Sequence, residues 1–244
     1  MKVLIATEKP FAKVAVDGIR EVLEKNGHTL AVLEKYTSVD EFYAAVADVD
    51  ALIVRSDKVT KEVIDHAKNL KIVVRAGAGY DNLDLEACTA RGIIAMNTPG
   101  QNSNAVAELV LGLLVYCVRN FYNGKAGSEL KGKKLGILAF GNVGRNVARI
   151  ANGFGMEVYA YDAFCSADVI NASGLAKAVA SQEALFEQCD IVTLHIPATA
   201  ETKQSINYNL VNKMHKGGIL INTARKEVIN EAELLKLMAE REDF

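Results

Sequence analysis

Several features that restrict function are scarce or absent in this sequence of 244 residues. It has no tryptophan, three prolines and four cysteines. The cysteines lie far apart, at Cys88, Cys117, Cys165 and Cys189, without a CxxC pair or a metal-ligand spacing. We therefore expect reduced thiols that act as small apolar side chains, and no metal site.

Long apolar runs and an excess of charge are also missing. No run approaches the roughly 18 residues that span a bilayer, and the first residues lack the apolar core of a signal peptide. The net charge is −2, which gives no electrostatic reason to expect nucleic acid or a membrane as a partner. Half of the residues are apolar and 24% are charged, as in a globular protein. We expect a cytoplasmic protein of one large domain or two ordinary ones.

The first hundred residues alternate short β-branched runs with amphipathic stretches. This pattern predicts helices such as 14–25, stopped by Gly27, and 59–67. The predicted strands are 3–6, 29–33, 51–54, 72–74 and 93–96. Alternating strands and helices indicate a parallel sheet with helices on both faces.

A longer apolar-periodic segment, at about 102–122, predicts a helix that connects two domains. Its apolar residues recur at spacings of three and four, at Val106, Leu109, Val110, Leu113, Leu114 and Cys117. This face suits dimer packing and ordinary core burial equally. Small and polar residues follow at 123–128, which is a composition typical of linkers.

A second series of strands and helices begins at Lys134. Its predicted strands are 135–139, 157–161, 191–195 and 218–222, and its last helix is 231–241. The fold class is therefore α/β, with two tandem doubly wound parallel-sheet domains at 1–100 and 101–244. The sequence stops where a further strand is expected, which indicates a second domain that is incomplete at the C-terminus.

A glycine-containing turn at 135–144 resembles a dinucleotide-binding fingerprint. Gly141 and Gly144 occupy the second and third glycine positions of GxGxxG, whereas Ala139 occupies the first. The backbone N–H groups of Asn142 and Val143 would then face the phosphates at a helix start. We expect the helix to bury a stripe made of Val143, Val147, Ile150 and Phe154.

Asp162 follows the next predicted strand. A carboxylate there accepts hydrogen bonds from the adenosine ribose and repels a 2′-phosphate, and no arginine follows it. The pattern predicts NAD in preference to NADP. The alternative is an ordinary turn at Gly141 and an aspartate that merely ends a strand.

Four segments in order along the chain resemble motifs of the D-isomer-specific 2-hydroxyacid dehydrogenases. They are 75–84 (RAGAGYDNLD), 97–108 with its NTPG and AVAE, 194–197 (LHIP) and 217–225 (GGILINTAR). Residues 52–56 (LIVRS) are similar to the phosphoglycerate dehydrogenase branch. The resemblance implies a flavodoxin-like substrate domain at 1–100, an NAD-binding Rossmann domain at 101–244, and a homodimer in the full-length form. It also implies a return segment to the substrate domain beyond residue 244, so we expect a C-terminally truncated chain.

The resemblance assigns roles to individual residues. It implies that Arg225 is the catalytic arginine, which holds the substrate carboxylate with its planar guanidinium. A surface arginine that caps a strand is the alternative. Further cofactor contacts are expected from Ala78, Ile196, Pro197, Thr223 and Ala224.

Substrate contacts are expected in the first domain. The backbone N–H groups of Gly77, Ala78 and Gly79 would bind a carboxylate, and Arg55 and Arg75 are the candidate cations. A tight turn at 77–79 and ordinary surface ion pairs are the alternatives.

A general base has no candidate in this sequence. The family's catalytic histidine follows the arginine by several tens of residues. His195 belongs by resemblance to the segment beside the cofactor and is not that base. We therefore expect this 244-residue chain to show little or no dehydrogenase activity.

Three functions remain open. The first is NAD-dependent oxidation of a small 2-hydroxy acid, D-3-phosphoglycerate to 3-phosphohydroxypyruvate in serine biosynthesis being favoured. The second is an NAD(H)-binding sensor that recruits partners without catalysis. The third is another substrate, such as glyoxylate, hydroxypyruvate or D-lactate.

Overall fold

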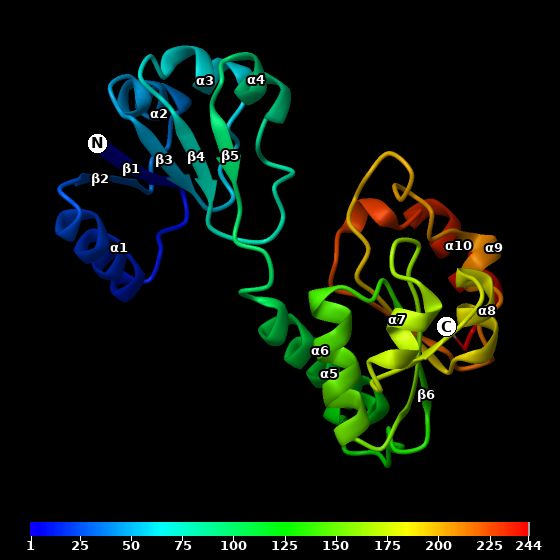
Figure 1. The fold of residues 1–244 in the computed structure, drawn as a ribbon. Coiled ribbons are helices and arrows are strands. Elements are labelled where there is room, and N and C mark those ends of the chain that lie inside the picture. The colour runs from blue at the N-terminus through cyan, green and yellow to red at the C-terminus, as the bar shows by residue number, and fades with distance from the viewer. Residues whose placement is uncertain (244) are drawn as a thin grey trace. The chain divides into compact units, whose positions relative to one another are not determined.

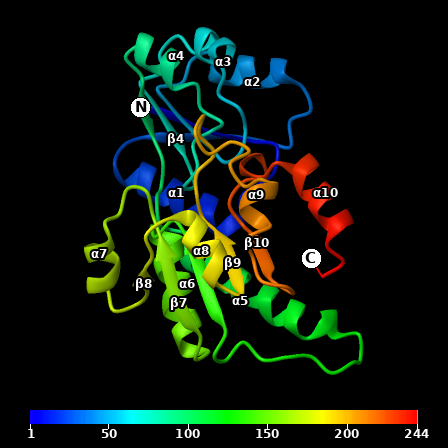
Figure 2. The same cartoon turned by 90° about the vertical axis from the view of Figure 1, so that its right-hand side faces the viewer.

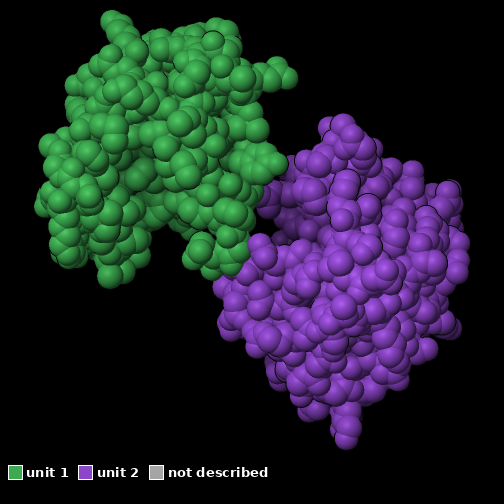
Figure 3. All heavy atoms as spheres, viewed as in Figure 1, with its two compact units in different colours: residues 1–101 green, residues 102–244 purple. Residues whose placement is uncertain are grey.

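The computed structural model describes residues 1–243 and divides the chain into two compact units. The first comprises residues 1–101 and the second begins at Asn102 (Figure 3). Each unit contains one five-stranded parallel sheet with helices. This architecture confirms the predicted α/β fold.

The first unit alternates strands and helices along its whole length (Figure 1). Its strands are β1 (Lys2–Thr7), β2 (Thr29–Glu34), β3 (Ala51–Val54), β4 (Ile72–Arg75) and β5 (Ile94–Met96). Its helices are α1 (Lys13–Lys25), α2 (Val39–Val46), α3 (Lys61–His66) and α4 (Leu85–Ala90). The strand order is β2-β1-β3-β4-β5, so the order reverses between β1 and β3. This is the flavodoxin-like order of a doubly wound sheet.

Local signals in the sequence explain where these helices begin and end. Ser38 and Glu41 form a capping box at the start of α2, and Asp84 accepts a hydrogen bond from the N–H of Ala87 at the start of α4. Gly27 follows the end of α1 with a φ of +70°, which only glycine adopts without strain.

The second unit holds the glycine-containing turn near the middle of its sheet. Its strands are β6 (Lys134–Leu138), β7 (Glu157–Tyr161), β8 (Lys177–Ala178), β9 (Ile191–Leu194) and β10 (Ile219–Asn222). Its helices are α5 (Ser103–Val118), α6 (Asn142–Gly153), α7 (Ala167–Ala172), α8 (Gln182–Gln188), α9 (Tyr208–Val211) and α10 (Glu231–Glu240), with 3₁₀ turns η1 (Asn120–Tyr122) and η2 (Lys226–Val228). The strand order is β10-β9-β6-β7-β8, so the order reverses between β6 and β9. Figure 2 shows the neighbouring strands of this sheet from the side.

The buried faces of α5 and α6 differ from those predicted. In α5, Leu109 of the predicted face is 54% exposed, and in α6 Phe154 is 41% exposed. The buried residues of α5 are Ser103, Ala107, Val110, Leu111, Leu114 and Val118, and those of α6 are Gly144, Val147, Ala148 and Ala151. The two helices pack against each other, and small residues at the contact allow their backbones to approach closely. A prediction from the large apolar residues alone missed this packing.

The predicted helix at 102–122 also ends earlier than expected. The helix α5 stops at Val118, and Asn120, Phe121 and Tyr122 all have φ between +50° and +55°. Such backbone is costly for residues other than glycine. The rings of Phe121 and Tyr122 lie 5.1 and 5.8 Å from the ring of Tyr116.

Across residues 1–243, no helix combines the length and apolar character that a membrane span requires.

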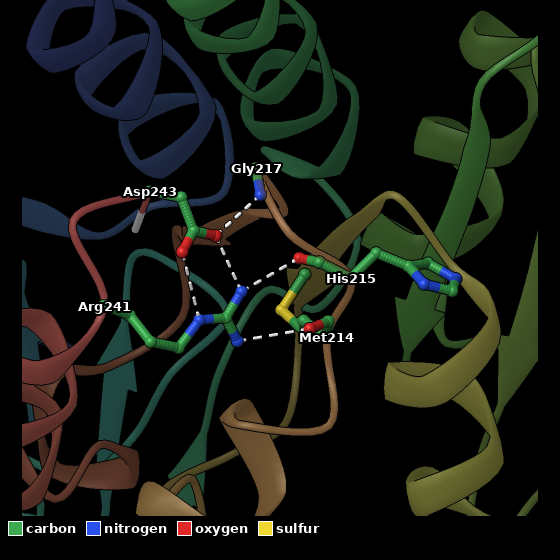
Figure 4. A network of polar contacts seen from close by, with 5 residues as sticks. All are labelled: Met214, His215, Gly217, Arg241 and Asp243. Atoms are coloured by element: carbon green, nitrogen blue, oxygen red, sulfur yellow. Dashed lines mark hydrogen bonds and ion pairs between the residues drawn. The ribbon is translucent and has the colours of Figure 1, made fainter.

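A polar network joins the end of α10 to the turn before β10 (Figure 4). The guanidinium of Arg241 donates to the carbonyl oxygens of Met214 and His215 at 3.1 Å and forms an ion pair of 2.7 Å with Asp243. The carboxylate of Asp243 also accepts from the N–H of Gly217 at 2.7 Å. These donors hold the pKa of Asp243 at about 2, first through the Arg241 hydrogen bonds and then through the Gly217 N–H.

Candidate cofactor and substrate site

The glycine-containing turn leads from β6 into α6, beside the point where the strand order reverses. Ligands of open α/β sheets bind at the carboxyl ends of the strands at such a point. A Cβ on Gly144 would lie 2.3 Å from the carbonyl oxygen of Ala139 and 3.0 Å from Cγ2 of Ile137. Only glycine therefore allows α6 to pack this closely on β6. A Cβ on Gly141 would meet nothing within 4 Å among the described residues, so the backbone there is open to a ligand.

The first turn of α6 is suited to an anion. Gly141 is the N-cap, and no side chain caps the helix there. The N–H of Arg145 donates to the carbonyl of Gly141 at 3.0 Å, as a regular helix requires, whereas the N–H groups of Asn142 and Val143 precede the first such bond. Uncapped N–H groups and the helix dipole together attract phosphate.

The backbone of Ala139 is strained, because it takes the turn position of the first glycine in the fingerprint. Its φ is +79°, in the left-handed region where a side chain costs roughly 1–2 kcal/mol. Its N–H donates to the carbonyl of Tyr161 at 2.8 Å, which fixes the turn to the end of β7. Ala139 therefore adopts the conformation that a first glycine would adopt without this cost.

Asp162 lies at the carboxyl end of β7 and is bonded to this turn. Its Oδ2 accepts from the N–H of Phe140 at 2.6 Å. Its Oδ1 accepts from the N–H groups of Phe164 and Cys165 at 2.7 and 3.0 Å. A carboxylate offers about four lone-pair directions, so these bonds orient Asp162 and leave capacity for a ribose hydroxyl.

Arg145, which had no predicted role, contacts Phe140 and Cys165, whose N–H groups both donate to Asp162. The guanidinium carbon of Arg145 is 4.8 Å from the centre of the Phe140 ring, and its Nη2 is 3.8 Å from Sγ of Cys165. Arg145 thus braces the turn that contains Asp162. Its place directly after Gly144 in the fingerprint was the only signal in the sequence.

The segment after β9 carries the predicted cofactor residues Ile196 and Pro197, with His195 before them. The N–H of His195 donates to the carbonyl of Leu138 at 2.9 Å, and its Nε2 lies 3.1 Å from the hydroxyl of Thr193. Burial lowers the pKa of His195 from 6.5 to about 4. The imidazole is therefore neutral at pH 7 and a weak proton acceptor.

The segment after β10 carries Thr223, Ala224 and Arg225. The side chain of Asn222 folds this segment back, because it accepts from the N–H of Ala224 and donates to the carbonyl of Arg225, both at 2.9 Å. The buried hydroxyl oxygen of Thr223 has no hydrogen-bond partner among the described residues, which is the state expected of a group that bonds to a ligand. Asn222 was quoted in the sequence motif without a role, and asparagine after a strand is a recognisable turn signal.

The predicted residues of the second unit therefore gather at one edge of its sheet. Gly141–Gly144, Asp162, Ile196–Pro197 and Thr223–Arg225 follow β6, β7, β9 and β10, which are neighbours in the sheet. This edge combines a turn with glycines at 141 and 144, an uncapped helix start, the carboxylate of Asp162 and the unpartnered hydroxyl of Thr223. These groups fit the phosphates, ribose hydroxyls and amide of a dinucleotide.

The first unit holds the second group of predicted residues, at the carboxyl ends of β3 and β4. Arg55 directly follows β3, whereas Arg75 ends β4. A Cβ on Gly77 would lie 1.4 Å from Nη1 of Arg75, so glycine is required wherever the arginine takes this position. This contact links a predicted cation directly to the predicted carboxylate-binding loop.

Hydrogen bonds from both neighbouring strands fix this loop. The N–H of Ala76 donates to the carbonyl of Val54 at 2.8 Å, and the N–H of Thr98 donates to the carbonyl of Gly77 at 2.9 Å. The side-chain amide of Asn97 donates to the carbonyl of Ala78 at 2.7 Å. Asn97 belongs to the NTPG motif and had no predicted role.

The family described as D-isomer specific 2-hydroxyacid dehydrogenase, NAD binding domain, matches residues 117–243. The chain is 38% identical over 223 residues to a hydroxypyruvate reductase of Thermotoga maritima, covering 86% of this chain and 71% of that protein. It is 38% identical over 234 residues to the human D-3-phosphoglycerate dehydrogenase, covering 90% of this chain and 43% of that protein. The chain thus spans less than half the length of that dehydrogenase.

A solved structure gives the same relationship. The NAD⁺-bound 3-phosphoglycerate dehydrogenase of Entamoeba histolytica is 47% identical, with a TM-score of 0.92, and the match covers 100% of this chain and 78% of that one. The predicted family and its cofactor NAD are confirmed by these matches. The chain belongs to the D-isomer-specific 2-hydroxyacid dehydrogenase family and carries that family's NAD-binding domain.

Proposed function

We propose that the second unit binds NAD(H) at the carboxyl edge of its sheet and that the protein acts on a D-2-hydroxy acid, D-3-phosphoglycerate being the first candidate. The observation that carries the proposal is the close packing of the uncapped helix α6 on β6 at Gly144, beside Asp162. The 47% identity to a 3-phosphoglycerate dehydrogenase favours this substrate over hydroxypyruvate. Glyoxylate and D-lactate remain outcomes of the substrate test.

Bound NAD⁺ would supply the hydride acceptor. Arg225 would hold the substrate carboxylate, because a guanidinium offers two parallel N–H donors to it. In the first unit, the N–H groups of the loop at 77–79 would bind a carboxylate, and Arg55 would attract the phosphate of a phosphorylated substrate. Asp162 would accept a ribose hydroxyl and repel a 2′-phosphate, so NADH should bind more tightly than NADPH.

The proton acceptor is the group for which the described residues offer no candidate. His195 is neutral and its low pKa makes it a weak base, and His215 lies in the turn before β10, where its carbonyl accepts from Arg241. General base catalysis contributes about 10²- to 10⁴-fold in rate. The 244-residue polypeptide should therefore bind NADH and show little or no turnover.

Titration with NADH is the first test. The purified chain should bind NADH, and Asp162→Ala should bind it at least tenfold more weakly, because the variant loses a ribose acceptor and leaves the N–H of Phe140 unpartnered. Asp168→Ala, in the exposed first turn of α7, is the matched control and should retain the affinity of the unmodified chain. Equal affinity in both variants would refute the role of Asp162.

An activity assay tests the expected lack of turnover. NADH production is measured with D-3-phosphoglycerate, D-glycerate, glycolate and D-lactate, and product inhibition is avoided by trapping the oxo acid. Robust turnover by this polypeptide would contradict the missing base. NADH binding without turnover would agree with the missing proton acceptor, and it would favour the second candidate, an NAD(H) sensor.

Dimer formation is a further proposal of the same kind. Four large side chains on α5 and the following turn are well exposed, namely Leu109, Tyr116, Phe121 and Tyr122. Such a patch favours an interface between copies of the chain. Light scattering should give a mass near twice 26.4 kDa, and Phe121→Ser combined with Tyr122→Ser should shift the mass to that of the monomer.

A further inference from the structure

Phe164 is the most exposed of the large apolar side chains among the described residues, with 99% of its surface accessible. Exposed apolar residues are common on protein surfaces, so exposure alone assigns no role. The position of Phe164 is more informative. It lies two residues after Asp162, in the segment between the carboxyl end of β7 and the start of α7.

The backbone of Phe164 is fixed to the glycine-containing turn through one carboxylate. Oδ1 of Asp162 accepts from the N–H of Phe164 at 2.7 Å, and Oδ2 of the same group accepts from the N–H of Phe140 at 2.6 Å. The following N–H, that of Cys165, is bonded to Asp162 as well. The backbone that carries the ring is therefore held in place although the ring itself is exposed.

Other aromatic rings near this turn are committed elsewhere. Phe140 is only 1% exposed and is covered by the guanidinium of Arg145. Tyr161 is half-buried and packs against a hydrophobic core cluster that includes Leu138 and Val192. Phe164 is thus the aromatic side chain at this edge whose two faces are available to a ligand.

The order of groups along the edge matches the order of groups in the adenosine half of a dinucleotide. The uncapped start of α6 suits the phosphates, Asp162 suits the ribose, and Phe164 comes next. We propose that Phe164 stacks on the adenine ring of bound NAD(H). A planar ring on a rigid backbone gains stacking energy and loses little conformational entropy on binding.

This inference rests on the proposed function, because it names a contact of the same cofactor. Titrations of the 244-residue chain with NADH and with ADP-ribose test it without any turnover. Phe164→Ala should raise both dissociation constants roughly tenfold, within the range found when aromatic residues that stack on bases are replaced by alanine. Phe154→Ala, at the end of α6 and 41% exposed, is the matched control and should leave both constants unchanged.

Conservative variants distinguish stacking from simple apolar contact. Phe164→Tyr should retain the affinity of the unmodified chain, whereas Phe164→Leu should resemble Phe164→Ala, because leucine has no aromatic face. Unfolding midpoints should be equal for all of these variants, since the side chain makes no packing contact that its replacement would remove. If Leu restores tight binding, or if Ala does not weaken it, the stacking role is wrong.

The absence of tryptophan from the chain allows a direct optical test. Phe164→Trp places a single indole at the proposed position, and its fluorescence should be quenched as AMP or ADP-ribose saturates the site. The indole of Phe154→Trp should not respond. No NADH binding by the unmodified chain would overturn the proposed function itself, whereas NADH binding that neither quenches Phe164→Trp nor weakens in Phe164→Ala would overturn only the inference about Phe164.

Discussion

Replacement of Gly144 by alanine tests the packing on which the proposed cofactor site depends. The added Cβ would lie 2.3 Å from the carbonyl oxygen of Ala139, whereas carbon–oxygen contacts are ordinarily about 3.3 Å or longer. The start of α6 must therefore retreat by roughly 1 Å from β6. Because the obstacle is backbone and not a flexible side chain, the helix itself has to move.

The energetic effect has two opposing parts. Overpacking of this kind costs about 1–3 kcal/mol, while replacing a helical glycine by alanine gains up to about 1 kcal/mol. Gly153, the last residue of the same helix, provides the matched control, because a Cβ there meets nothing within 4 Å among the described residues. Gly153→Ala should be as stable as the unmodified chain or more stable, and Gly144→Ala should be less stable than Gly153→Ala by about 1–3 kcal/mol.

Urea denaturation and NADH titration on both variants provide the measurement. Displacing the first turn of α6 should weaken NADH binding at least tenfold in Gly144→Ala and leave it unchanged in Gly153→Ala. If Gly144→Ala matches Gly153→Ala in both stability and affinity, then the close approach of α6 to β6 is not what holds the site, and the reasoning is refuted.

Three further outcomes are expected. Ala139→Gly should stabilise the chain by about 1 kcal/mol in urea, because it removes a side chain from a backbone with φ of +79°; a loss of stability would show that the turn is not strained. Asp243 has a pKa of about 2 in the folded chain against 3.8 otherwise, so its stabilisation is complete above pH 3.8 and is lost as the pH falls to about 2; the stability difference between the unmodified chain and Asp243→Asn should shrink over that window and be constant above it. His195 has a pKa of about 4 in the folded chain against 6.5 otherwise, so the unfolded chain takes up the proton first, and stability should decline as the pH falls from 6.5 to about 4; an imidazole that titrates near 6.5 by NMR would contradict its burial.

The sequence alone was sufficient for the features that depend on local patterns. Alternating β-branched runs and amphipathic stretches predicted two parallel sheets with helices. The reason is that the spacing of apolar residues typical of a strand or a helix can be read within each segment. The ordered motifs at 75–84, 135–144, 194–197 and 217–225 predicted the family and its cofactor. Gly27 predicted the end of α1, since a positive φ after a helix is a local requirement.

Contacts between distant segments could not be predicted from the sequence. The large apolar residues of α5 and α6 predicted buried faces that include Leu109 and Phe154, yet both are well exposed, because the two helices approach each other through small residues. Which faces of two helices meet depends on both partners at once, and the periodicity of one helix does not contain that information.

For the candidate site too, some features were predictable from the sequence and others only from the tertiary structure. The sequence placed Gly144, Asp162 and Arg225 after three of the predicted strands, and parallel strands necessarily bring their carboxyl ends to one edge. Only the tertiary structure showed that one carboxylate, that of Asp162, joins the turn at Phe140 to the backbone of Phe164. It alone placed Arg145 beside Cys165. The contacts of Asp162 with Phe140 and of Arg145 with Cys165 join residues 22 and 20 positions apart. Their distances are set by the order and twist of the strands in the sheet and not by any local propensity of the chain.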